Sequence, residues 1–203
     1  MIRNIVFDMG NVLIRFDPGY FLTREGIETP EDREILMREL FLSLEWAQMD
    51  RGDLREETAE PLILSRIPDR LKETARRLLY NWADPRDVIE GMEDLVRRLK
   101  AAGYGTYLLS NASVRQHQYW PKYAVSRLMD GKLISCDVHT VKPCREIYEA
   151  FTGKFGLKGE ACLFIDDAAM NVAGAVACGW DGIVFHGSAK ELEERLREKG
   201  VFC

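Results

Sequence analysis

Several features by which protein classes are identified are missing from this sequence of 203 residues. Its five cysteines are odd in number and form no Cys-x-x-Cys pair. This pattern argues against a disulfide framework or a zinc site and favours reduced thiols. No apolar run approaches the ~20 residues that span a bilayer, and no basic segment followed by an apolar one opens the chain. We therefore expect a cytoplasmic protein with no membrane contact.

An excess of positive charge is also missing. Lys and Arg number 28 against 33 Asp and Glu, so the net charge is -5. Nucleic-acid surfaces concentrate positive charge, so we expect no nucleic-acid partner. Apolar residues at 46% and charged residues at 30% are typical of globular domains. The length suits one domain, or one domain with an insertion. We expect a monomer or a homodimer.

Alternating strand patterns are absent from residues 17–87. The segment EILMRELFLSLEW places Met37, Leu40, Phe41 and Leu44 on one apolar stripe, which predicts a helix. RLKETARRLLYNW repeats the helical period, and prolines fall where helices are expected to start or stop. We predict a block of about four helices here.

After residue 87 strand and helix patterns alternate. Strands are predicted at 104–111, 133–138, 161–167 and 181–185, and helices at 88–103, 114–123, 144–156, 170–179 and 188–200. Such alternation implies an α/β fold, with parallel strands joined by right-handed crossovers and helices on both faces. The first apolar strand, residues 2–7, must join this sheet. Residues 17–87 are then a helical insertion into a core of residues 1–16 and 88–203.

Polar residues follow four of the predicted strands or the loops after them, at the edge where parallel sheets bind ligands. Each alone is explained as a turn or cap residue, but together they place three carboxylates at one edge. Such carboxylates repel one another unless a cation neutralises them. Oxygen ligands without His or Cys suit Mg²⁺. The residues are Asp8, Ser110, Asn111, Lys142, Asp166 and Asp167.

The order and strand-end placement of these residues resemble the four motifs of the haloacid dehalogenase (HAD) superfamily. FDMGNVLIRFD, LLSN, VKP and FIDDAAMNVAGA are most similar to the branch that includes bacterial α-glucose-1-phosphate phosphatases. The resemblance implies a Rossmann-like core, with residues 17–87 as a helical cap of the C1 type. It also implies a Mg²⁺-dependent phosphatase acting on a small phosphate ester, such as a hexose-1-phosphate.

The resemblance implies a role for each motif residue. Asp8 would be the nucleophile that forms an aspartyl-phosphate. Asp8, Asp166 and the backbone carbonyl of Gly10 would ligate Mg²⁺. Asp167 would hold the waters of the metal or contribute a ligand.

The remaining motif residues would act on the phosphate group. Ser110, with backbone amides near Asn111, would bind its non-bridging oxygens. Lys142 would pair with both Asp8 and the phosphate, offsetting charge in the transition state. Asn171 would support the site from the following helix.

Gly10 departs from the family pattern. Phosphatases of this superfamily usually carry there a second aspartate, which protonates the leaving group and later activates water. A positioned general acid or base contributes ~10²–10⁴-fold, so its absence favours substrates that leave easily, such as anomeric sugar phosphates. Water or another residue can supply this function, and His117 is one candidate, although a structural histidine is the more common case.

Two alternatives to a phosphatase stay open. Dehalogenases of this superfamily also lack the second aspartate, but they need no metal and have little use for a paired Asp166 and Asp167. The chain can also be a catalytically weakened ligand-binding protein with the HAD fold. The intact Asp8, Lys142 and Asp166 argue against this second alternative.

Specificity is expected to come from the cap, since it alone is large enough to close over the site. Trp46, Trp82 and Tyr20 are candidates for a sugar-facing wall, although aromatic residues at helical spacing more often belong to the core. Asp17, directly before Pro18, is expected to form a structural turn.

Overall fold

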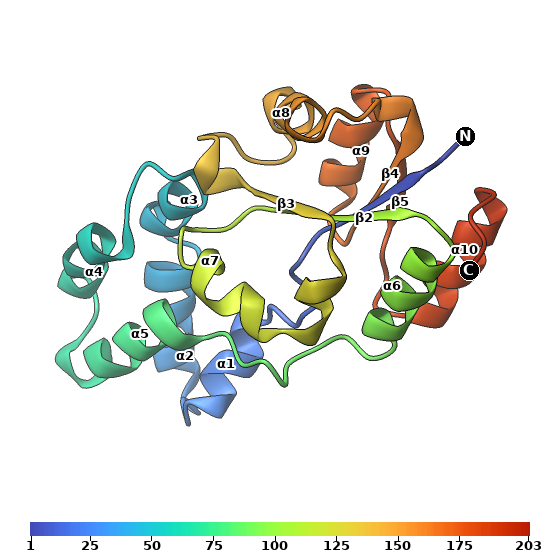
Figure 1. Cartoon of the computed structure of the whole chain (residues 1–203). Helices are drawn as coiled ribbons and strands as arrows, with labels where there is room; N and C mark the ends of the chain where they lie inside the picture. The colour runs from blue at the N-terminus through green and yellow to red at the C-terminus, as the bar shows by residue number, and fades with distance from the viewer.

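The computed structural model describes all 203 residues and contains one parallel sheet of five strands. The spatial order is β3-β2-β1-β4-β5, with β1 in the centre, as Figure 1 shows. The predicted α/β fold with a parallel sheet is confirmed. The strands are β1 Asn4–Phe7, β2 Gly105–Ser110, β3 Gly131–Ile134, β4 Cys162–Asp166 and β5 Asp181–Val184.

Helices cover both faces of the sheet. In Figure 1, α6 (Met92–Ala101) and α10 (Ala189–Glu198) lie on one face, while α8 (Arg145–Phe155) and α9 (Ala169–Ala177) lie on the other. Side chains of the strands alternate between two buried clusters, because successive residues of a strand point to opposite faces. Ile5, Phe7, Leu108, Leu163 and Ile165 belong to one cluster, and Val6, Leu109, Leu133 and Phe164 belong to the other.

The strand register brings the carboxyl ends of the central strands to one edge. Phe7 lies level with Leu108 on β2 and with Ile165 on β4. The backbone N–H of Asp8 donates to the carbonyl of Ile165 at 2.8 Å. Asp8 therefore follows directly after the carboxyl end of the central strand β1, which lies between β2 and β4.

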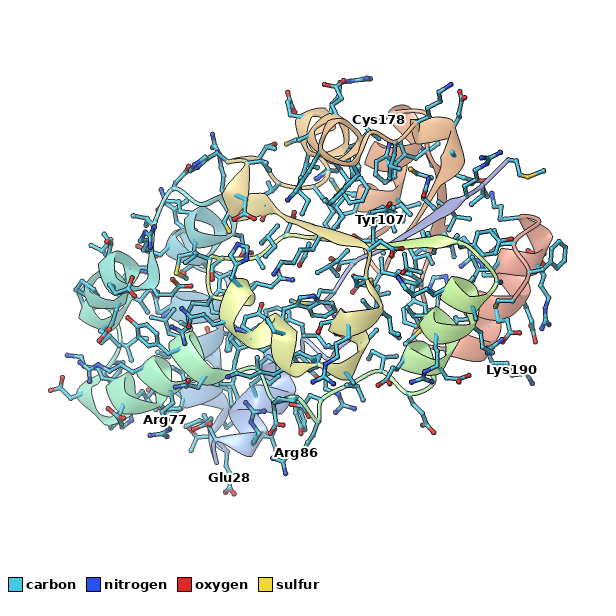
Figure 2. All side chains as sticks on the ribbon, in the orientation of Figure 1. Glu28, Arg77, Arg86, Tyr107, Cys178 and Lys190 are labelled. Atoms are coloured by element: carbon cyan, nitrogen blue, oxygen red, sulfur yellow. The ribbon has the colours of Figure 1, made fainter.

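Six α-helices lie between β1 and β2 in the chain, and the first five of them precede the core helix α6. These five are α1 Pro18–Arg24, α2 Pro30–Leu36, α3 Leu44–Arg51, α4 Glu56–Ser65 and α5 Asp69–Asn81, with a π-helical turn at Met37–Phe41. We call residues 18–81 the helical insertion. Figure 2 shows the labelled Glu28 and Arg77 on its outer surface.

The expected apolar stripe is wrong at its end. Leu40 and Phe41 are buried, but Leu44 is 69% exposed. The chain leaves the helix after the π-turn and starts a new one, because the hydroxyl of Ser43 accepts a hydrogen bond from the Trp46 N–H at 3.2 Å and so caps α3. Two short helices with different buried faces replace the one that was predicted.

Two other predicted helices and one predicted strand are longer than the observed elements. The helix expected from Val88 begins at Met92, because Gly91 adopts a left-handed φ of 78°; Val88 instead bridges to Ile14 and is 47% exposed. The segment 114–123 contains only α7 (Gln116–Tyr119) and a 3₁₀ turn. The strand expected to reach residue 138 ends at Ile134 and continues as the 3₁₀ turn η4, Ser135–Asp137.

Asp17, expected to form a turn, caps α1, and Ser188 caps α10. The Asp17 carboxylate accepts from the Tyr20 N–H at 3.1 Å, and the Ser188 hydroxyl accepts from Glu191 N–H at 3.2 Å. The structure contains no helix with the length and apolar character required to cross a membrane.

The helical insertion is fixed to the core at the end of β3. Gly52 ends α3 in a left-handed conformation with φ of 85°, and it lies directly against the backbone of Cys136 in η4. A Cβ atom on Gly52 would approach Cys136 Cα to 2.9 Å and clash with its carbonyl. The hydroxyl of Ser135 donates to the carbonyl oxygen of Asp50. This contact sets the position of the α3 carboxyl end relative to the sheet.

Gly52→Ala is expected to destabilise the protein more than Gly26→Ala. Both glycines have positive φ, but a Cβ on Gly26 would meet nothing within 4 Å. The two variants therefore share the backbone strain of roughly 1–2 kcal/mol, and only Gly52→Ala adds an overpacking cost of about 1–3 kcal/mol. Urea unfolding of both variants measures the difference in the free energy of unfolding. Equal losses would contradict the tight contact between α3 and η4.

Candidate active site

The buried Lys142 joins the two carboxylates that follow β1 and end β4. Its Nζ donates to Asp8 Oδ1 at 2.6 Å, to Asp166 Oδ2 at 2.7 Å and to the Leu109 carbonyl at 3.2 Å. These bonds use all three protons of the ammonium group, and the side chain is 1% exposed. In this geometry Lys142 positions the carboxylates and balances their charge.

For both Asp8 and Lys142, burial and the charge of the partner shift the pKa in opposite directions. Burial is the largest influence on Asp8 and, with the repulsion from Asp166, outweighs the attraction of Lys142, raising the pKa of Asp8 to about 7. Burial alone would lower the pKa of Lys142, but the two carboxylates outweigh it and raise this pKa above its ordinary value. The lysine therefore stays charged, while Asp8 needs further positive charge to be fully ionised at neutral pH.

Asp166 is held in one orientation by groups of the loop and helix that follow it. Its Oδ1 accepts from the Ala168 N–H at 2.8 Å. The Asn171 side chain, on α9, donates to both carboxylate oxygens at 3.1 and 3.0 Å. The structure thus places Asn171 beside the site, where the sequence comparison suggested a supporting residue.

Asn11 is a site residue that the sequence analysis missed. Its φ of 55° is left-handed, which asparagine tolerates better than most residues. Its amide donates to Asp167 Oδ2 at 3.2 Å, and its Oδ1 accepts from the Phe16 N–H at 3.1 Å. Asn11 therefore ties the loop after β1 to the second of the paired aspartates.

Three carboxylates form a group that fits a hard cation. Asp8, Asp166 and Asp167 each offer an oxygen, and these oxygens lie within 4.8 Å of one another. Lys142 supplies only one positive charge against the three, so the group carries excess negative charge. Gly10 lines the same cavity, with a Cβ at its position 3.2 Å from Phe16 Cβ. Oxygen ligands of this number and charge suit Mg²⁺.

Asn111 fixes the backbone that carries Lys142. Its amide donates to the Lys142 carbonyl at 3.1 Å, and its Oδ1 accepts from the Lys142 N–H at 2.9 Å. Asn111 also lines the cavity, whereas Ser110 is buried and does not. The backbone after β2 is thus the part of this motif that faces the cavity.

A cavity of about 270 Å³ lies between this group and the helical insertion. Trp46 and Trp82, two of the aromatic residues singled out from the sequence, line it. Tyr20 does not line it; its hydroxyl donates to Asp87 Oδ1 at 3.1 Å. The wall facing Asp8 is therefore partly aromatic.

Two carboxyl groups of the helical insertion also line the cavity, and the sequence analysis missed both. Asp50 lies near the end of α3 and Glu56 is the first residue of α4. Glu56 Oε1 accepts from the Ser113 hydroxyl, while its Oε2 is buried without a hydrogen-bond partner. No local motif marks these residues, because only the docking of the insertion turns them toward the site.

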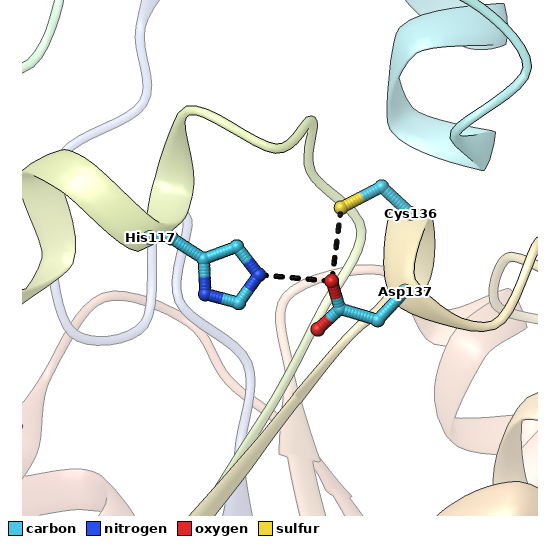
Figure 3. Close-up of side chains that lie close together, drawn as sticks. All are labelled: His117, Cys136 and Asp137. Atoms are coloured by element: carbon cyan, nitrogen blue, oxygen red, sulfur yellow. Dashed lines mark hydrogen bonds and ion pairs between the residues drawn. The ribbon is translucent and has the colours of Figure 1, made fainter.

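His117 does not line the cavity. Figure 3 shows its Nε2 paired with Asp137 Oδ1 at 2.8 Å, while the Cys136 thiol donates to the same oxygen at 3.7 Å. Burial raises the pKa of Cys136 to about 12, so the thiol is neutral. The suggestion that His117 supplies acid–base help is therefore wrong for this structure: its ring is engaged outside the cavity.

Two curated relatives share part of this sequence. A flavin mononucleotide hydrolase of Arabidopsis thaliana is 27% identical over 113 residues, 56% of this chain and 46% of that protein. A sesquiterpene phosphatase of Aspergillus oryzae is 26% identical over 182 residues, 88% of this chain and 87% of that protein. The chain thus spans about half the length of the first relative and most of the second.

Solved structures share the fold. A HAD family enzyme of Bacteroides thetaiotaomicron in complex with magnesium and inorganic phosphate matches with a TM-score of 0.68 at 22% identity, covering 95% of this chain and 99% of that one. Structures described as dehalogenases match as well, so the fold alone does not separate the two chemistries. The family model of haloacid dehalogenase-like hydrolases matches residues 2–179. The chain therefore belongs to the haloacid dehalogenase-like hydrolase family.

Proposed function

We propose that this protein is a Mg²⁺-dependent phosphatase that cleaves a small phosphate ester through an aspartyl-phosphate. The observation that carries the proposal is the buried group of Asp8, Lys142 and Asp166, joined by bonds of 2.6 and 2.7 Å, whose Asp8 lines the cavity. Two relatives, a flavin mononucleotide hydrolase and a sesquiterpene phosphatase, are named for phosphate-ester substrates or phosphatase activity.

In this proposal Asp8 attacks phosphorus and the ester oxygen leaves. Lys142 holds Asp8 in position and offsets the charge of the neighbouring carboxylates. The backbone amides near Asn111, which lines the cavity, receive the phosphate oxygens, while the predicted contact from the Ser110 hydroxyl would require this buried side chain to reach the cavity. Water then hydrolyses the aspartyl-phosphate and restores Asp8.

The metal ligands would be Asp8, Asp166 and the Gly10 carbonyl, with Asp167 binding directly or through water. Bound there, Mg²⁺ would polarise the phosphate oxygens and offset the negative charge of the three carboxylates. The orientation of Asp166 by Asn171 and of Asp167 by Asn11 supports this assignment, because ligand carboxylates are held by further hydrogen bonds.

A sugar phosphate such as a hexose-1-phosphate is the substrate we propose. The cavity of about 270 Å³ is just below the range of ~300–1,000 Å³ that suits drug-sized ligands, which favours a compact molecule. Its lining combines aromatic faces with carboxyl and amide groups, which suits a sugar ring with its hydroxyls. In this role the helical insertion acts as a C1-type cap that closes the site.

The dehalogenase alternative uses the same nucleophile without a metal. It leaves Asp167 and its bond to Asn11 without a function, so the geometry favours the phosphatase. A catalytically weakened binding protein would not need the buried charged group, since such groups are expensive to maintain.

The test compares protein treated with a chelator and protein loaded with Mg²⁺ on a panel of phosphomonoesters. We expect a loss of at least ~10²-fold without Mg²⁺, since a metal contributes several kcal/mol to the transition state. The same samples are assayed for chloride release from 2-haloacids. Equal hydrolysis in both states, or none in either, contradicts the proposal, and metal-independent chloride release supports the dehalogenase.

A further inference from the structure

Asp50 lies on the wall of the cavity that also contains Asp8. Its backbone is fixed from both sides: the Ser135 hydroxyl donates to its carbonyl, and Gly52 packs against the Cys136 backbone two residues later. Its carboxyl group interacts with its surroundings through burial and charge, with no hydrogen bond to a protein donor. A carboxyl group without a protein hydrogen-bond partner is thus held on the wall of the cavity that Asp8 also lines.

Glu56 gives a second, independent indication that a donor is missing on this wall. The residue is 2% exposed, and its Oε2 is buried without a hydrogen-bond partner. Buried acceptors are normally satisfied, and no protein donor reaches this one, so a donor for Glu56 Oε2 must come from water or from a molecule in the cavity. Asp50 and Glu56 therefore place two carboxyl groups on the cavity wall that the helical insertion contributes.

Three other polar side chains that line the cavity, Tyr80, Tyr119 and Arg115, are poorly suited to acid–base work. Burial is the main cause that raises the pKa of Tyr80 to about 12 and the pKa of Tyr119 well above its ordinary value. The Arg115 guanidinium donates twice to the Tyr80 carbonyl, at 3.2 and 2.8 Å. Gly10 has no side chain, and His117 lies outside the cavity.

The pKa of Asp50 suits a group that must both donate and accept a proton near neutral pH. Burial, followed by the repulsion of Glu56, raises its pKa to about 7, against the attraction of Lys142. An acid–base group is most effective when its pKa lies near the working pH. The charged or titratable groups that act on Asp50 or are acted on by it are Glu56, Lys142, Asp8, Tyr119 and Cys136.

We propose that Asp50 of the helical insertion is the general acid and base of the reaction, in place of the side chain that Gly10 lacks. This inference rests on the proposed phosphatase function and deepens it. It extends the substrate class to phosphate esters of ordinary alcohols, whose oxygen must be protonated to leave.

The proton balance of the two steps is complete. When Asp8 Oδ bonds to phosphorus and the ester P–O bond breaks, the proton of the Asp50 carboxyl goes to the leaving oxygen, which departs as an alcohol. Asp50 is then a carboxylate. It takes a proton from the water that attacks the aspartyl-phosphate, so inorganic phosphate leaves and both carboxyl groups return to their starting states.

The experiment compares Asp50→Asn with the wild type on two Mg²⁺-dependent substrates, an alkyl phosphate and p-nitrophenyl phosphate. For the alkyl ester we expect kcat to fall ~10²-fold or more, since its leaving group needs a proton. For the aryl ester, whose leaving group is stable as an anion, we expect the phosphorylation step to change no more than about threefold. Single-turnover measurements isolate that step.

Two further variants separate catalysis from structure. Asp53→Asn is the matched control, because Asp53 lies three residues away, pairs with Arg51 at 3.5 Å and does not line the cavity. Asp53→Asn should leave the rate of hydrolysis of both substrates unchanged. Adding Gly10→Asp to Asp50→Asn should restore part of the alkyl phosphatase activity, which a purely structural role of Asp50 does not predict.

Each outcome decides the proposal. A drop of equal size on both esters, or no drop on either, overturns the role of Asp50 while the Mg²⁺-dependent activity of the wild type stands. If the wild type hydrolyses neither ester with Mg²⁺, the phosphatase function itself fails. The two failures are therefore distinguishable from the same assay.

Discussion

Asp8→Asn will abolish hydrolysis of every phosphate ester that the wild type cleaves, with kcat lower by ~10⁴-fold or more. The amide has nearly the same shape as the carboxylate but cannot attack phosphorus. Its Oδ1 can still accept the bond from Lys142 Nζ, so the buried group keeps its geometry. Phosphate release measured at saturating substrate and Mg²⁺ gives the loss.

The fold of the Asp8→Asn variant should remain intact. Asp8 is a buried carboxyl whose ionised form is disfavoured by burial and by Asp166, so a neutral side chain is tolerated there. Thermal unfolding provides this control, and mass spectrometry of quenched reactions tests for a phosphorylated enzyme in the wild type alone. Residual activity above about 1% of the wild type would show that another group attacks phosphorus.

Lys142→Met will have the second largest effect, because it removes the charge between Asp8 and Asp166. Methionine fills a similar volume but leaves two buried carboxylates without their partner. Breaking a buried pair in this way costs about 3–5 kcal/mol of the free energy of unfolding. We also expect kcat to fall by ~10³-fold, as transition-state charge loses its support.

The stability loss of Lys142→Met should grow with pH in metal-free protein. Lys142 lowers the pKa of Asp8, so its removal raises that pKa further above the ordinary value of 3.8. The folded state then holds a proton that the unfolded chain has released, and the free energy of unfolding falls as the pH rises through the folded pKa. Urea unfolding at about pH 5 and about pH 8 measures this slope.

Lys199→Met is the matched control for Lys142→Met. Lys199 and Asp181 form an ion pair at 2.7 Å, the same distance as Lys142 to Asp166, but both side chains are about 40% exposed. Exposed pairs contribute only ~0–1 kcal/mol. Similar losses for the two lysine variants would contradict the importance of the buried charge group.

The sheet was readable from the sequence because its strands are short apolar runs buried on both faces. Helix boundaries were harder to predict from the sequence where a single residue changes the local conformation. Ser43 caps a new helix inside an unbroken apolar pattern, and Gly91 delays α6 by adopting positive φ. Both effects depend on one hydrogen bond or one torsion, which periodicity does not record.

The candidate site was predictable only where it follows strand ends. Asp8, Asp166 and Lys142 meet because parallel strands bring their carboxyl ends together. Asp50 was not predictable, because it sits within a helix and reaches the cavity only through contacts of the insertion with Ser135 and Cys136. Residues on core strand ends are fixed by topology, whereas residues on an inserted segment depend on docking.

The central place of β1 has a consequence for the order in which the chain acquires its structure. Asn4 pairs with Gly105 on one side and with Cys162 on the other, so both partners of the first strand are made long after it. Contacts so distant in sequence form slowly. During synthesis β1 has no strand to pair with until β2 is made, whereas the helices of the insertion can form earlier from local contacts. The nascent chain therefore has no assembled site until β4 has left the ribosome.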